Sequence, residues 1–86
     1  MYPARDYYGP VWIVSGEHKG KLGFVDDYDE LGGESVAIVY LEGETPSVGA
    51  YVLVPVHDLE QPPESEIKGL EERIWVSAVM KHGPSR

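Results

Sequence analysis

Residues 11–25 read Val-Trp-Ile-Val-Ser-Gly-Glu-His-Lys-Gly-Lys-Leu-Gly-Phe-Val. The first four of these residues are apolar and rich in β-branched side chains, which suits a largely buried strand. Ser15 and Gly16 interrupt that run, and a second apolar run begins at Leu22. The stretch therefore predicts a strand, a tight loop and a second strand.

Three glycines, Gly16, Gly20 and Gly23, fall within eight residues of this stretch. Glycine is favoured where φ must be positive or where two backbone segments approach closely. Gly23 lies inside the second predicted strand, where a glycine is typical of a bulge or a sharp coil. A small barrel needs such a bend to close, so Gly16 and Gly23 are predicted to be structural residues.

The loop from Gly16 to Gly23 resembles the KOW motif, G-x-x-K-G-K-x-G, of ribosomal large-subunit proteins and transcription elongation factors. The close match covers about residues 9–29, and a weaker similarity continues to Glu60. The resemblance implies a five-stranded SH3-like barrel without a catalytic site. It also implies a contact loop between the first two strands, formed by Glu17, His18, Lys19, Gly20 and Lys21.

The length of 86 residues is that of one small domain. We expect a mainly β fold, a small five-stranded SH3-like (KOW-type) barrel with a C-terminal α-helix. The expected organisation is an N-terminal arm at 1–10, the barrel at 11–61, and a Pro-Pro linker with the helix at 62–86. Strands are expected at 11–15, 21–27, 35–41 and 50–54, and a 3₁₀ turn at 56–60 with Leu59 as its apolar plug.

Residues 26–34 form the most acidic run of the chain, Asp-Asp-Tyr-Asp-Glu-Leu-Gly-Gly-Glu. We interpret it as a solvated hairpin loop that ends in a glycine pair. Its carboxylates could ligate a divalent cation, but their spacing lacks the alternation and the terminal glutamate of an EF-hand loop. The loop interpretation is therefore preferred.

The tail carries helix signals between Glu64 and His82, with acids near the start, cations near the end and a Gly-Pro stop. Ile67, Leu70, Ile74 and Ala78 recur at spacings of three and four and predict one apolar face. Val76 and Met80 would then lie on the opposite side and form a second contact surface. A sixth strand over 73–80 is the alternative, because Ile74-Trp75-Val76 has strand composition.

The formal net charge is −8, and residues 1–60 hold the whole imbalance. That segment contains only three basic residues, Arg5, Lys19 and Lys21, against eleven acidic ones. Nucleic-acid binding relies on clustered Lys and Arg, so the charge disfavours it. The absence of cysteine, of a long apolar run and of a signal-peptide pattern leads us to expect a cytoplasmic protein.

No pattern predicts catalysis or a metal site, and no cofactor is expected. His18, His57 and His82 follow no metal-ligand spacing. His57 and Asp58 are a candidate acid/base pair, but adjacent residues on a turn are expected to point apart. Ser15 and Gly16 do not form a strand-to-helix nucleophile elbow. We therefore expect a chain that is not an enzyme.

Two hypotheses about function remain open. The first is an acidic protein–protein interaction module, either an immunity- or antitoxin-like inhibitor or an adaptor that self-associates through its tail helix. The second, implied by the resemblance, is an RNA-binding domain associated with the ribosome or with transcription. The charge favours the first, whose expected interface residues are the aromatic and Met side chains Tyr7, Tyr8, Tyr28, Trp75 and Met80.

Overall fold

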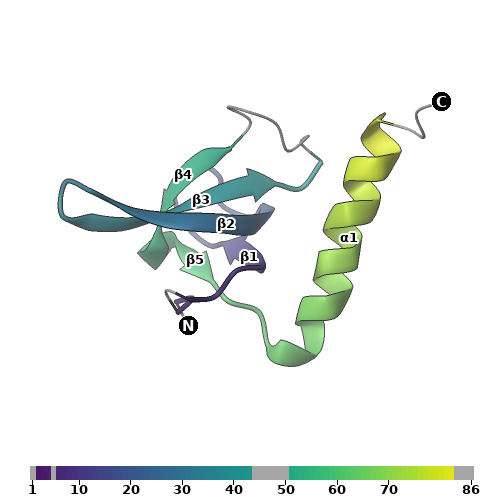
Figure 1. The fold of residues 1–86 in the computed structure, drawn as a ribbon, viewed down its shortest axis with the longest axis horizontal. Coiled ribbons are helices and arrows are strands. Elements are labelled where there is room, and N and C mark those ends of the chain that lie inside the picture. The colour runs from purple at the N-terminus through teal and green to yellow at the C-terminus, as the bar shows by residue number, and fades with distance from the viewer. Residues whose placement is uncertain (1, 5, 44–50, 83–86) are drawn as a thin grey trace.

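The structure is a computed structural model that describes residues 2–4, 6–43 and 51–82, with only the backbone described for residues 77–82. Its described part is a five-stranded antiparallel sheet followed by one α-helix (Figure 1). The strands are β1 (Pro10–Ile13), β2 (Leu22–Leu31), β3 (Glu34–Leu41), β4 (Val52–Pro55) and β5 (Leu59–Glu60). A 3₁₀ turn, η1 (Val56–Asp58), joins β4 to β5, and α1 (Glu64–His82) follows.

The order of strands in the sheet is β4-β3-β2-β1-β5. The first and second strands therefore lie side by side, as the sequence predicts, with Val11 opposite Gly23. The five-stranded, mainly β prediction is confirmed. Leu59 is buried as expected, with 1% of its surface exposed, but the 3₁₀ turn ends at Asp58, and Leu59 and Glu60 pair with β1 as β5. Pro55 ends β4, and position 50, where that strand was expected to begin, lies outside the described residues.

One face of the sheet holds the apolar core. Its members are almost fully buried and come from all five strands: Val11, Ile13, Val25, Ala37, Val39, Val54 and Leu59. They occupy alternate positions along their strands, as the pleat requires. The opposite, outer face carries Trp12, Phe24 and Tyr40 at the intervening positions.

The acidic run is not a loop, and this prediction was wrong. Residues 26–31 continue β2, which pairs with β3 as far as Leu31 opposite Glu34 (Figure 1). Only Gly32 and Gly33 form the turn, with φ of 58° and 82°, as a two-residue hairpin of the I′ type requires. The acidic run can adopt a strand conformation because the Tyr28 side chain packs against the core and the paired strand β3 contributes β-branched residues.

The bulge also lies elsewhere than predicted. The register between β2 and β3 shifts between Val25 and Asp27, so Asp26 is the extra residue. Gly23 remains in register with both neighbouring strands. A glycine is required there by close packing instead, because a Cβ at position 23 would overlap Cγ1 of Val39 and lie 3.1 Å from the carbonyl oxygen of Tyr40.

The tail forms the predicted helix and not the alternative sixth strand. In Figure 1, α1 stands beside the sheet on the side away from the β2–β3 hairpin tip. Ile74 is buried, with 8% of its surface exposed, and Ile67 and Leu70 are half-buried, which confirms the predicted apolar face. Val76 is 58% exposed, as expected, whereas the side chains of Ala78 and Met80 lie outside those described.

Candidate functional site

The predicted contact loop is a tight turn held by its own backbone. The amide of Gly20 donates to the carbonyl of Ile13 at 2.7 Å, and that of Lys21 to His18 at 3.1 Å. Gly16 and Gly20 have φ near +90°, a conformation that glycine adopts without strain. Lys19 and Lys21 are both exposed on this loop. The loop therefore presents two separate cations on a rigid turn.

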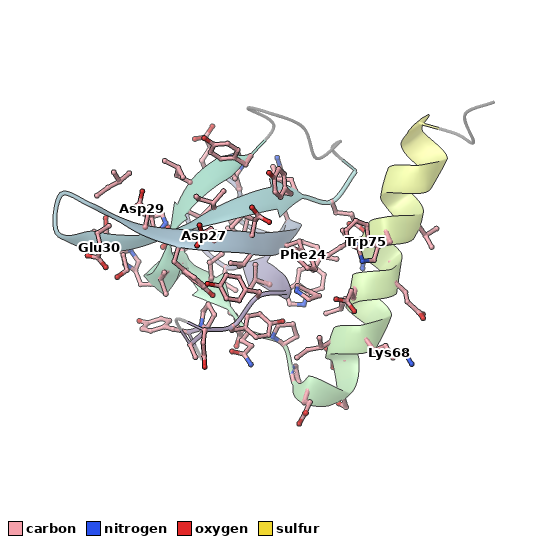
Figure 2. The ribbon with its side chains drawn as sticks, in the orientation of Figure 1. Phe24, Asp27, Asp29, Glu30, Lys68 and Trp75 are labelled. Carbon is pink, nitrogen blue, oxygen red and sulfur yellow. The ribbon has the colours of Figure 1, made fainter. Side chains whose placement is uncertain are left out.

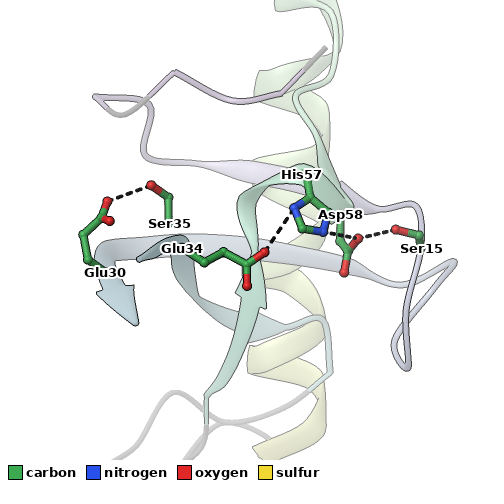
Figure 3. A network of polar contacts seen from close by, with 6 residues as sticks. All are labelled: Ser15, Glu30, Glu34, Ser35, His57 and Asp58. Atoms are coloured by element: carbon green, nitrogen blue, oxygen red, sulfur yellow. Dashed lines mark hydrogen bonds and ion pairs between the residues drawn. The ribbon is translucent and has the colours of Figure 1, made fainter. Parts of the chain in front are cut away.

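A polar network ties this loop to η1 (Figure 3). The Ser15 hydroxyl donates to Oδ1 of Asp58, and Nε2 of His57 lies 3.4 Å from the same oxygen. Nδ1 of His57 lies 3.3 Å from Oε2 of Glu34. The expectation that His57 and Asp58 point apart was therefore wrong, because the turn brings both side chains to the same side.

The order of contacts in this network matters for chemistry. Nucleophilic catalysis needs the serine hydroxyl to donate to the histidine, which then removes its proton. Here the hydroxyl of Ser15 donates to a carboxylate, and His57 is more than half exposed to solvent. The network anchors the loop and the turn, and it does not form an activated nucleophile.

Three of the predicted interface residues come together where the N-terminal arm meets β2. The Tyr28 hydroxyl donates to the carbonyl of Tyr7 at 2.6 Å, and the Tyr7 hydroxyl donates to that of Pro10 at the same distance. The rings of Tyr8 and Tyr28 meet edge to face at 5.7 Å. These tyrosines fasten the arm to the sheet, and only Tyr8 exposes about half of its surface.

The same burial shifts the titration of two of these hydroxyls. Desolvation, together with the neighbouring Tyr8, Tyr7 and Asp6, raises the pKa of Tyr28 to about 12. Desolvation, with a smaller contribution from Glu71, also raises the pKa of Tyr7. Both hydroxyls therefore stay protonated at a pH where an exposed tyrosine has begun to ionise, and Tyr28 does so over the wider range.

Four aromatic side chains make up what we call the aromatic row: Trp75 on α1, Phe24 on β2, Tyr40 on β3 and Tyr51 just before β4. The rings of Trp75 and Phe24 lie 5.9 Å apart, and Figure 2 shows them facing each other between helix and sheet. Phe24 is the cross-strand partner of Tyr40, whose ring meets Tyr51 edge to face at 6.2 Å. The two ends are open, since Trp75 is 52% and Tyr51 43% exposed.

Acidic side chains continue from this row along the outer face of β2. Asp27 lies opposite Ile38, two positions from Tyr40 on β3, and therefore shares the face of the row. Asp29 follows two residues later, nearer the hairpin tip (Figure 2). Both carboxylates accept a hydrogen bond from the next backbone amide at 2.8 Å and are exposed. An apolar strip thus borders a negatively charged one.

The sequence predicted only part of this site. Trp75 belongs to the row, Tyr7, Tyr8 and Tyr28 lie together at the arm, and the side chain of Met80 lies outside those described. Phe24, Tyr40 and Tyr51 were missed as site residues. The available signal was strand alternation, which correctly places Tyr51 and Leu53 on one face but does not reveal their cross-strand neighbours.

No family model, curated protein or solved structure matches the chain. Within residues 2–4, 6–43 and 51–82, no three His, Asp or Glu side chains are arranged to hold a metal ion. In the same part of the chain, no helix has the length and apolar character needed to cross a membrane.

Proposed function

We propose that the chain is a non-catalytic protein-binding module whose interface is the aromatic row together with the acidic strip beside it. The observation that carries the proposal is the exposure of Trp75 and Tyr51, which belong to two ring pairs joined by the cross-strand partners Phe24 and Tyr40. Trp and Tyr are the side chains most enriched among those that dominate binding energy at protein interfaces. A partner would cover the row and exclude water from it.

The negative charge beside the aromatic row indicates a partner with a positively charged surface. Asp27 and Asp29 project from the same face, within a segment whose acidic residues far outnumber its basic ones. A partner with lysines or arginines beside an apolar patch would be both attracted and correctly oriented. An inhibitor of a basic enzyme, in the manner of an immunity protein or antitoxin, is the narrower form of this proposal.

RNA binding is the competing function, and Lys19 and Lys21 favour it because both are exposed on a rigid loop. A protein binds a phosphate backbone tightly when many of its lysines and arginines contact phosphates. This loop offers only two lysines for such contacts. Aromatic rings can stack bases, but Asp27 beside the row would repel the phosphates that accompany them. The protein partner is therefore preferred.

The sheet is also proposed to close into an SH3-like barrel of the KOW type. The strand order β4-β3-β2-β1-β5 supports this, because η1 is a short link between the two edge strands. A second support is the amide of Val14, which donates to the carbonyl of Asp58 at 2.8 Å beyond the end of the β1–β5 ladder.

Affinity capture with matched variants tests the proposed interface. The immobilised chain is exposed to an RNase-treated lysate of the source cell, beside Tyr51→Ala, Trp75→Ala and Tyr2→Ala. Tyr2 is the control because it is 63% exposed and lies outside the row. We expect one protein to be retained by the wild type and Tyr2→Ala and lost from both row variants, whose folding is checked by circular dichroism. The proposal is contradicted if Tyr51→Ala and Trp75→Ala retain the captured protein as well as the wild type does, or if capture is lost on RNase treatment.

A further inference from the structure

Strand β2 runs past its neighbour β1 and leaves part of one edge without a strand beside it. The β1–β2 ladder ends with Pro10 opposite Phe24. One more backbone hydrogen bond joins the amide of Val25 to the carbonyl of Gly9. Among the described strands, only β3 pairs with residues 26–31, which project beyond the rest of the sheet in Figure 1. An open edge of this kind can pair with a strand of another chain.

The register of the hairpin decides which backbone groups face this open edge. In a two-residue hairpin the closing pair, here Leu31 and Glu34, is a hydrogen-bonded pair. Such pairs recur at every second residue, so Leu31 and Asp29 point their amides toward β3. Tyr28 and Glu30 occupy the alternate positions, and their amides therefore face away from β3. An added strand would need these two amides as hydrogen-bond donors.

Side chains of the chain itself already engage both of these amides. The amide of Tyr28 donates to Oδ1 of Asp27 at 2.8 Å. The amide of Glu30 donates to Oδ1 of Asp29, also at 2.8 Å. Each aspartate therefore caps the amide that follows it. Hydrogen bonds to a charged acceptor are stronger than those to a neutral one, so an incoming carbonyl would have to displace a better acceptor to pair here.

Pairing of this edge with a second copy of the chain would also bring like charges together. Symmetric antiparallel addition would pair Tyr28 of each copy with Glu30 of the other. Asp29 would then lie opposite Asp29 of the other copy, in the type of pair whose Cα atoms are only about 4.5 Å apart. Like charges directly opposite each other destabilise a strand pair. Residues 26–31 carry four acidic and no basic side chains, so no other register removes the repulsion.

We propose that Asp27 and Asp29 keep this edge of β2 closed to strand addition by a second copy of the chain. Their carboxylates hold the two amides that face the edge. Asp29 adds charge repulsion at the centre of the pair that two copies would form. This role concerns the edge of the hairpin, and it does not depend on what binds the aromatic row.

Two double variants separate the caps from the charge. Asp27→Ala/Asp29→Ala removes both caps, whereas Asp27→Asn/Asp29→Asn makes the same change in net charge and keeps an oxygen that can accept from each amide. Circular dichroism checks their folding, and sedimentation equilibrium measures their association. We expect the alanine variant to dimerise, and the asparagine variant and the wild type to do so at least about tenfold more weakly. If the alanine variant associates no more than the wild type, or the asparagine variant as tightly as the alanine variant, the caps do not close the edge.

Cysteine trapping locates the contact between the two copies. The chain has no cysteine, so Asp27→Ala/Asp29→Cys introduces a single thiol at the position that would face its own counterpart. We expect mild oxidation to link two copies there, because the Cα separation of such a pair suits a disulfide. Asp27→Ala/Asp29→Ala/Leu31→Cys is the control and should crosslink several-fold more slowly, since residue 31 would face residue 27 of the other copy. Equal crosslinking from both positions would overturn the proposal.

Discussion

Arg73 on α1 donates two hydrogen bonds to the carboxylate of Glu42, which directly follows β3, with Nε–Oε2 and Nη2–Oε1 distances of 2.5 and 2.9 Å. The same guanidinium lies over the ring of Trp12, with its Cζ 5.7 Å from the ring centroid. The hydrogen bonds to Glu42, and the attraction of its charge, raise the pKa of Arg73. One side chain therefore joins the helix to β1 and to the end of β3.

Arg73→Lys should loosen α1 without unfolding the sheet. A lysine ammonium cannot reproduce the planar two-pronged contact with Glu42 or the stacking on Trp12. We expect amide hydrogen exchange in α1 to become several-fold faster while β2 and β3 stay protected. Lys68→Arg is the control, since Lys68 projects away from the sheet (Figure 2). If amide hydrogen exchange in α1 does not change, the contacts of Arg73 with Glu42 and Trp12 do not hold the helix against the sheet.

Gly23→Ala should destabilise the sheet by about 1–3 kcal/mol, the usual cost of overpacking a filled core. The new methyl group would overlap Val39 in the centre of the core. Gly69→Ala is the opposite control, because it lies in α1 with nothing within 4 Å of its added Cβ. That change should stabilise the chain by up to about 1 kcal/mol. Urea unfolding of the two variants measures both effects, and equal midpoints would refute the packing explanation.

The hairpin turn makes a further prediction. Gly33 has φ of +82° in the two-residue turn, where an L side chain is strained. Gly33→Ala should lower the free energy of unfolding by about 1 kcal/mol, and Gly33→Asn by less, because Asn tolerates this conformation. Thermal unfolding of the pair measures the difference. If alanine and asparagine behave alike, residues 32–33 do not form this turn.

Stability should fall between about pH 10 and pH 12. The pKa of Tyr28 is raised from 10 in the unfolded chain to about 12 in the folded one. Above pH 10 the unfolded state releases this proton first, so rising pH favours unfolding until the folded state also titrates. The expected loss is about 1 kcal/mol, reduced for solvent screening of a partly exposed group.

Urea unfolding at pH 9 and at pH 11.5 measures this loss. Tyr28→Phe removes the hydroxyl and should flatten most of the dependence, leaving the smaller contribution of Tyr7, whose pKa is also raised. A Tyr28→Phe variant with the same pH dependence as the wild type would place the titrating group elsewhere.

The sequence predicts this fold well where apolar residues mark the strands. Residues 11–14 and 35–41 are nearly continuous in strand formers, and β1 and β3 lie there. The prediction from sequence is wrong at residues 26–31, which were expected to be a loop because Asp and Glu have poor strand propensity. There Tyr28 packs on the core, and pairing with β3 outweighs local preference. The glycine pair was the better signal, since two glycines between two such runs indicate a two-residue hairpin.

The candidate site was harder to predict than the fold. Strand alternation places Tyr51 on the outer face, but only the register of the sheet puts Tyr40 opposite Phe24. The contact of Trp75 with Phe24 depends further on how α1 docks, which Arg73 and Ile74 determine together. Local sequence contains neither relationship, because both join segments far apart in the chain.

The most direct test of the proposed interface is site-specific photo-crosslinking in the source cell. A photoreactive benzoylphenylalanine replaces Tyr51 in one variant and Tyr2 in the other, both of which are exposed aromatic positions. We expect a discrete protein adduct from position 51 that is absent from position 2 and that disappears when Trp75→Ala is added. Equal adducts from both positions, or an RNA adduct at position 51, would contradict the proposed interface.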